Sequence, residues 1–139
     1  MKTRFSPLVK VKKNVMQKSE QFLQKANSNL NSASTALELS YSSLKDVEPP
    51  NKGTMSEMLA SRTLLNSQRE LIKHNREWVN FAANQVNQAK KQLKLDMIEH
   101  EKFQYLELQE IKQELQKRKI RDAKELDEIA LMTHNGKNR

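Results

Sequence analysis

The side chains that could take part in neutral-pH chemistry are three histidines, His74, His100 and His134. A metal site needs several ligands that converge, and none of the three has a partner at metal-ligand spacing. The chain has no cysteine, which excludes disulfides and thiolate zinc sites. It also lacks a glycine-rich phosphate loop, a nucleophile elbow and a Ser/His/Asp set that could converge on a cavity. We therefore expect no enzyme activity, no metal and no cofactor.

The elements that carry these residues are long helices, as the composition indicates. Of the 139 residues, 36% are hydrophobic and 30% are charged, and the chain has two glycines and three prolines. Such a chain lacks the material for a layered core, but its helix-forming residues can bury narrow apolar stripes. A coiled coil needs only two apolar positions per heptad. The expected fold is therefore all-α and coiled-coil.

Sequence punctuation divides the chain into two helices. Tandem prolines in Glu48–Gly53 cannot lie inside a helix, so the chain turns there. Thr54 and Glu57 form a capping-box pattern at the start of the next helix, and Ser6 with the following proline indicates the start of the first. A stop signal at Asn135 and Gly136 then gives one coiled-coil domain over 1–139, with helices at about 6–47 and 54–133 and a flexible tail at 134–139.

Both helices carry a heptad repeat that predicts pairing within one molecule. Small residues mostly lie three positions further on, so the partner helix can approach closely. In the first helix the repeat is Val9, Met16, Leu23, Leu30, Leu37 and Leu44, with Lys12, Ser19, Ala26, Ala33, Ser40 and Val47 as companions. In the second it is Met58, Leu65, Ile72, Val79, Val86 and Leu93, with Ala82 and Ala89. We predict an antiparallel hairpin.

The second helix is longer than the first, so part of it is expected to overhang. Pairing residues 6–47 with 54–95 leaves about 35 residues projecting beyond the N-terminus, at about 1.5 Å per residue. Beyond Leu93 the apolar spacing changes, which predicts a shift of register. The later apolar positions form a stripe that could dock into a groove of a partner: Leu108, Ile111, Leu115, Leu126 and Ile129.

The positive charge is concentrated at the N-terminus, where residues 1–18 hold six basic residues and no acid. This segment is either a solvated helix start or a docking patch for an acidic partner, because Phe5, Leu8, Val9 and Val11 alternate with the lysines. The segment lacks the apolar run of a signal peptide, and no window is long and apolar enough to span a bilayer. A cytoplasmic protein is expected.

The two ends of the chain resemble the FliJ family of flagellar export proteins, in the opening RFSPLVKVKKNVMQKSE and the closing RDAKELDEIALM. The length of the chain, the helix break near residue 50 and the lack of cysteine also agree with this family. The resemblance implies a stalk-like antiparallel coiled coil that inserts into the ring of the export ATPase, FliI. It also implies contact with the export gate, FlhA, handling of export chaperones, and a place at the inner face of the membrane at the flagellar base.

The resemblance also implies which residues bind these partners. The ATPase-binding set is expected to lie side by side at the two ends of the chain: Phe5, Leu8, Val9, Lys10, Val11 and Lys12 with Lys124, Leu126, Asp127, Glu128 and Ile129. The gate-binding set has no matching motif and is a hypothesis about the half of the hairpin near the turn: Leu37, Tyr41, Leu64, Leu71 and Trp78.

Other functions and assemblies stay open on the sequence alone. The chain could be an adaptor that holds export substrates or chaperones without touching the ATPase. It could also be a basic coiled-coil protein that binds anionic lipid or nucleic acid, although residues 19–139 carry a net charge of only +2. Two hairpins could associate through Leu8, Val15 and Phe22, so the oligomeric state is undetermined.

Overall fold

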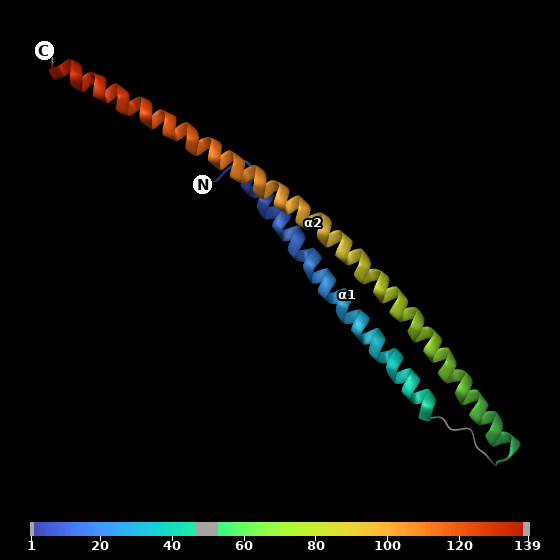
Figure 1. The fold of residues 1–139 in the computed structure, drawn as a ribbon. Helices are drawn as coiled ribbons and strands as arrows, with labels where there is room; N and C mark the ends of the chain where they lie inside the picture. The colour runs from blue at the N-terminus through green and yellow to red at the C-terminus, as the bar shows by residue number, and fades with distance from the viewer. Residues whose placement is uncertain (1, 47–52, 138–139) are drawn as a thin grey trace. The chain divides into compact units, whose positions relative to one another are not determined.

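The computed structural model describes residues 2–46 and 53–137, which form two helices packed as a hairpin. Helix α1 spans Ser6–Asp46 (41 residues) and α2 spans Met55–Lys137 (83 residues). No strand occurs in these described ranges, so the prediction of an all-α coiled-coil hairpin is confirmed. The chain divides into two compact units, which we call unit 1 (residues 1–16 and 96–139) and unit 2 (residues 17–95). Figure 1 shows α1 and α2 side by side within unit 2.

The start of α1 is capped by a pair of hydroxyl groups. The Thr3 amide donates to Ser6 Oγ (2.9 Å), and the Phe5 amide donates to Thr3 Oγ1 (3.1 Å). The sequence pattern predicts the cap at Ser6, whereas the observed cap begins three residues earlier, at Thr3. Pro7 consequently falls in the first turn, where an amide would have no partner within the helix.

The start of α2 is capped as the sequence predicts. The Glu57 amide donates to Thr54 Oγ1 (3.3 Å), which satisfies one of the free amides of the first turn. The Glu57 side chain folds back over Gly53, where a Cβ would lie 2.5 Å from Glu57 Oε2. Glycine before the cap thus leaves room for the Glu57 carboxylate. Val47 and residues 48–52 of the predicted turn at 48–53 lie outside the described residues.

The seam of unit 2 follows the predicted heptad. Ala26, Val86 and Ala89 form a buried cluster, and Leu23 and Leu30 pack against it. These contacts place the early part of α1 against the late part of this stretch of α2, as an antiparallel pair requires. Small alanines next to leucines let the two helices approach closely while the larger side chains fill the space between them.

Met58 is the predicted seam residue that does not join the seam, because it is 51% exposed. All residues from Met55 to Ala60 are exposed, and partly buried positions begin at Ser61 and Leu65. Helix α1 ends at Asp46, so it does not cover the first turns of α2. The length of α1, rather than the heptad pattern, therefore sets where the seam begins.

A polar layer interrupts the apolar seam of unit 2. The buried Asn75 donates through Nδ2 to Ser40 Oγ (2.5 Å) and to the Ala36 carbonyl (3.3 Å). Ser40 Oγ in turn donates to the Ala36 carbonyl (2.8 Å). A buried asparagine finds these partners in only one alignment of the helices, so this layer favours a single register.

In unit 1 the α2 side of the seam keeps the heptad spacing but carries mostly polar residues, whereas α1 contributes Val9 and Met16. The inward positions of α2, at alternating spacings of four and three, are Asp96, His100, Phe103, Glu107, Glu110 and Glu114, and Glu99, Leu106 and Ile111 beside them are also partly buried. The predicted shift of register beyond Leu93 is therefore wrong. Leu108 and Leu115 lie exposed on the flanks, because the inward positions remain in phase and are occupied by side chains with polar ends.

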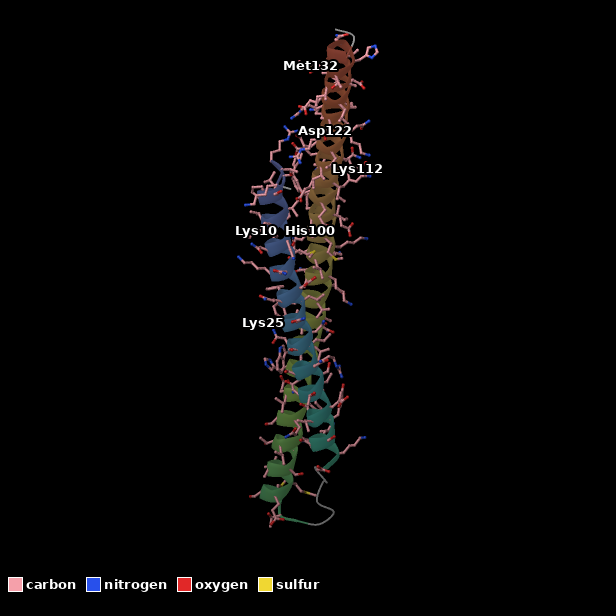
Figure 2. All side chains as sticks on the ribbon, turned by 90° about the vertical axis from the view of Figure 1, so that its left-hand side faces the viewer. Lys10, Lys25, His100, Lys112, Asp122 and Met132 are labelled. Atoms are coloured by element: carbon pink, nitrogen blue, oxygen red, sulfur yellow. The ribbon has the colours of Figure 1, made fainter. Side chains whose placement is uncertain are left out.

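The start of α1 reaches further along α2 than predicted. Lys12 Nζ lies 3.7 Å from Glu99 Oε2, and Arg4 Nε lies 3.6 Å from Glu110 Oε1. The predicted pairing placed residue 6 opposite residue 95, so the observed alignment carries the N-terminal segment more than a heptad further. The uncovered first turns of α2 account for this offset. Figure 2 shows the stretch of α1 labelled at Lys10 level with the stretch of α2 labelled at His100, both in unit 1.

The C-terminal part of α2 lies outside the seam. Every residue from Leu115 to Gly136 is exposed. The helix continues through Asn135 and Gly136 to Lys137, beyond the predicted end, because Gly136 does not have the positive φ of a helix-terminating glycine. No helix of the described residues is long and apolar enough to cross a membrane.

Candidate partner-binding surfaces

The N-terminal members of the expected ATPase-binding set lie in unit 1 and face two directions. Val9 and Lys12 turn toward α2 and are partly buried. Leu8, Lys10 and Val11 are exposed, and heptad geometry places them outside the seam. A partner that contacts this segment can therefore reach the second group without opening the hairpin.

Lys12 is a charged residue at a predicted seam position, and its side chain is partly buried. Its ammonium lies 3.7 Å from Glu99 Oε2 and 5.6 Å from the centre of the Phe103 ring. The carboxylate and the face of the ring both stabilise a cation, while the aliphatic part of the lysine covers the seam. The ammonium group of Lys12 therefore already has an acidic and an aromatic partner within unit 1.

Phe5 helps to form a shallow hollow in unit 1. Arg4 and Phe5 line it from the N-terminal side, and α2 contributes Tyr105, Gln109 and Glu110. The Arg4 guanidinium lies 4.9 Å from the centre of the Phe5 ring and 3.6 Å from Glu110. The hollow combines exposed aromatic edges with charge, as protein interfaces commonly do.

The C-terminal members of the set lie further along α2 than this hollow. Lys124, Leu126, Asp127, Glu128 and Ile129 are all exposed, with Leu126 and Ile129 at 66% and 58%. The N-terminal segment contacts α2 around Glu99 and Glu110, at least fourteen residues before Lys124. Both groups belong to unit 1, but the contacts within unit 1 do not bring them side by side.

The structure separates the five residues expected to bind the gate. Leu64, Leu71 and Trp78 are exposed at spacings of seven on one flank of the α2 seam. Leu37 is partly buried in the seam, in line with Leu23 and Leu30. Tyr41 belongs to the other flank, because its hydroxyl accepts a hydrogen bond from Arg76 Nη2 (2.5 Å).

Two further aromatic residues, Phe81 and Phe22, lie on the flank that carries Trp78, and the sequence analysis did not identify Phe81. Phe81 is 62% exposed and lines a hollow with His74, Glu77 and Trp78. Phe81 also lines a second hollow with Phe22 of α1, which is 56% exposed. The spacing of three between Trp78 and Phe81, next to a seam position, is the signal that could have found Phe81.

Comparison with protein families identifies the chain. The family model described as flagellar FliJ protein matches residues 1–139. The chain belongs to the FliJ family. This makes it a component of flagellar protein export, in a family whose members are non-catalytic. Comparison with curated proteins and with solved structures gave no match.

The buried histidine of this FliJ-family chain has a structural setting. His100 is 8% exposed at an inward position of unit 1, and its Nε2 has no hydrogen-bond partner among the described residues. No group of three or more potential metal ligands occurs in the described ranges. His100 therefore contributes a buried nitrogen without a hydrogen-bond partner to the seam. Burial of this nitrogen should lower the free energy of unfolding of the hairpin.

Proposed function

We propose that this FliJ-family protein is a cytoplasmic stalk that binds within the ring of the flagellar export ATPase, FliI. The observation that carries the proposal is the family match over the whole chain. A stalk must present an extended helix that its own hairpin does not cover. The exposed stretch of α2 from Leu115 to Gly136 is suited to this role as an overhang of the hairpin.

The ATPase contact, on this proposal, is made by exposed residues of unit 1. Leu126 and Ile129 present apolar surface on one stretch of helix, and Lys124, Asp127 and Glu128 surround them with charge. Such a pairing of apolar contact with a charged rim gives both affinity and orientation. Leu8, Lys10 and Val11 offer a second exposed contact at the start of α1.

The gate contact is proposed for the aromatic flank of unit 2. Leu71, Trp78 and Phe81 are exposed there and line or adjoin the two hollows described above. Exposed aromatic side chains are frequent hot spots of protein interfaces. Contact of this flank with the export gate, FlhA, and with export chaperones would place the protein at the inner face of the membrane without inserting into it.

The proposal is tested by measuring FliI turnover and oligomerisation with purified proteins. Wild-type protein should raise both. The variant L126E/I129E should weaken ATPase binding by about tenfold or more, because charged residues replace an apolar contact. It should retain the helical content of the wild type, since both positions are exposed.

The matched variant for this experiment is L71E/W78E, which makes the same kind of change on the aromatic flank of unit 2. It should weaken FlhA binding and leave ATPase stimulation intact, whereas L126E/I129E should do the reverse. Lack of any ATPase response to the wild-type protein would contradict the stalk role. Capture of chaperones without an ATPase response would favour the adaptor instead.

A further inference from the structure

The flank of the unit 2 seam opposite the aromatic residues carries a line of arginines. Arg62, Arg69 and Arg76 are spaced by seven residues on α2, and all three are exposed. We call them the arginine row. At about 1.5 Å per residue the row is about 21 Å long, on the green stretch of α2 in Figure 1. Heptad spacing keeps the three side chains on one side of the helix.

The part of the chain that the structure describes gives the arginine row no acidic partner. The positions three and four residues before and after each arginine hold no acid, so helical ion pairs cannot form. Among the described residues, the arginine row makes no ion pair across the hairpin either. The arginines near the C-terminus differ, because Arg118 has Glu114 and Asp122 four residues away on either side.

Neighbouring residues fix part of the geometry of the row. Lys73 lies four residues after Arg69 and three before Arg76, but Glu70 and Glu77 lie three residues before it and four after it, so Lys73 has acidic neighbours at helical spacing and the arginines do not. The Arg76 guanidinium donates to the Tyr41 hydroxyl (2.5 Å), a neutral partner that positions the cation without cancelling it. The arginine row is therefore an exposed line of cations without an acid at helical ion-pair spacing, which favours an acidic partner.

We propose that the arginine row binds an α-helix of a partner protein that carries aspartate or glutamate at heptad spacing. A helix laid along this flank repeats its acidic side chains every seven residues, about 10.5 Å, which equals the spacing of the row. Guanidinium groups bind carboxylates through two parallel hydrogen bonds, so each arginine can take one acid.

Other anionic partners fit the arginine row less well. A membrane surface favours a continuous apolar face beside the cations, but Leu64, Leu71 and Trp78 lie on the opposite flank. Tyr41, an exposed aromatic beside the row, uses its hydroxyl to bind Arg76. A nucleic acid has closely spaced phosphates and favours a continuous basic stripe. Here the row alternates with neutral residues, such as Asn66 and Asn80, each four residues after an arginine.

The test uses the full-length protein and a synthetic helical peptide of about 28 residues with one glutamate stripe at heptad spacing. A peptide of the same composition with its glutamates scattered around the helix is the comparison. At about 50 mM salt the striped peptide should bind more tightly than the scattered one, and added salt should weaken its binding. Equal binding of the two peptides, or no binding of either, would overturn the proposal.

Variants then locate the binding site. R62E/R69E should weaken binding of the striped peptide by about tenfold, because two attractive contacts become repulsive. The matched variant K18E/K91E makes the same change in net charge at two exposed positions away from the arginine row, and should change binding by less than about twofold. Equal weakening by both variants would show an effect of net charge alone and contradict the proposal.

The same two variants are measured with a DNA duplex and with vesicles of phosphatidylserine. Neither probe should bind in a way that depends on Arg62 and Arg69. If either binds more tightly than the striped peptide and loses binding in R62E/R69E, the partner is a nucleic acid or a membrane and the acidic helix is excluded. Circular dichroism should give the same helical content for both variants as for the wild type.

Discussion

Three polar side chains of the described residues are buried, Ser40, Asn75 and His100, and the last two differ in whether their hydrogen bonds are satisfied. Asn75 donates to Ser40 and to the Ala36 carbonyl, whereas Nε2 of His100 has no partner in the described part of the chain. Burial of a polar atom without a partner costs free energy, while a satisfied polar group specifies an alignment at little net cost. Substitutions at the two positions should therefore have opposite effects.

Replacement of Asn75 by alanine should destabilise the hairpin. The variant N75A loses both donated hydrogen bonds and leaves a small cavity beside Ser40, so the free energy of unfolding should fall by about 1–2 kcal/mol. Urea unfolding followed by circular dichroism measures the change. Asn80 is exposed on the same helix, and N80A is the control, with no comparable loss expected. Equal effects of N75A and N80A would contradict the role of the polar layer.

Replacement of His100 by leucine should stabilise the hairpin. The variant H100L removes the unsatisfied nitrogen and adds apolar contact next to Phe103, so the free energy of unfolding should rise by about 1–2 kcal/mol. The control is Q104L, at an exposed position one turn further along α2. A loss of stability in H100L would show that the imidazole makes a favourable interaction that the described contacts do not include.

At the scale of the helices, the two units use different seams. Unit 2 is held by alanine, valine and leucine around Ala26, Val86 and Ala89. Unit 1 has acids, a histidine and Phe103 at the corresponding positions of α2. The ion pairs of Arg4 and Lys12 in unit 1 involve partly exposed side chains. Exposed ion pairs contribute little to stability, about 0–1 kcal/mol each, so unit 1 should open more readily than unit 2.

Hydrogen exchange should show this difference directly. Amides in residues 6–16 and 96–114 should exchange faster than those in residues 23–40 and 72–93, because the polar seam opens at a lower free energy. Mass spectrometry of exchanged peptides measures both sets in one sample. The variant H100L should slow exchange in the first set more than in the second. Uniform protection along both helices would contradict the difference between the seams.

The sequence predicts much of this architecture, because leucine and alanine at heptad spacing have few other places to pack. The α1 seam from Val9 to Leu44 follows the predicted positions. The α2 side of the unit 1 seam gives a weaker signal, since its inward positions include Asp96, His100 and Glu107 beside Phe103. Leu106 and Ile111 are partly buried next to these positions, while Leu108 and Leu115 are exposed, and periodicity analysis takes such flanking residues for the seam.

The candidate surfaces were harder to predict than the helices. A shift of one residue along a helix moves a side chain from the seam to a flank: Ser40 is buried, whereas Tyr41 is exposed beside Arg76. Leu37 is at a seam position and so was a weak choice for a surface contact. The distance between the N-terminal residues and Lys124 depends on the offset between the helices, which the length of the uncovered start of α2 determines. The offset between the two helices cannot be predicted from composition and heptad spacing.

At the scale of the whole molecule, folding and ATPase binding should be separable by truncation. A chain that ends at Leu115 loses the stretch of α2 that is exposed up to Gly136, so the free energy of unfolding reported by the single tryptophan, Trp78, should change by less than about 0.5 kcal/mol. The same truncation removes Leu126 and Ile129 and should abolish stimulation of FliI.

A second truncation, ending at Leu95, separates the contribution of the unit 1 seam from that of the exposed stretch. It removes Glu99, Phe103 and Glu110, the partners of Lys12 and Arg4, so residues 6–16 should lose their hydrogen-exchange protection. Unit 2 retains its own seam and should still unfold cooperatively. If the chain ending at Leu115 also lost protection in residues 6–16, the exposed stretch would contribute to the fold, and its proposed role as a free contact for the ATPase would be wrong.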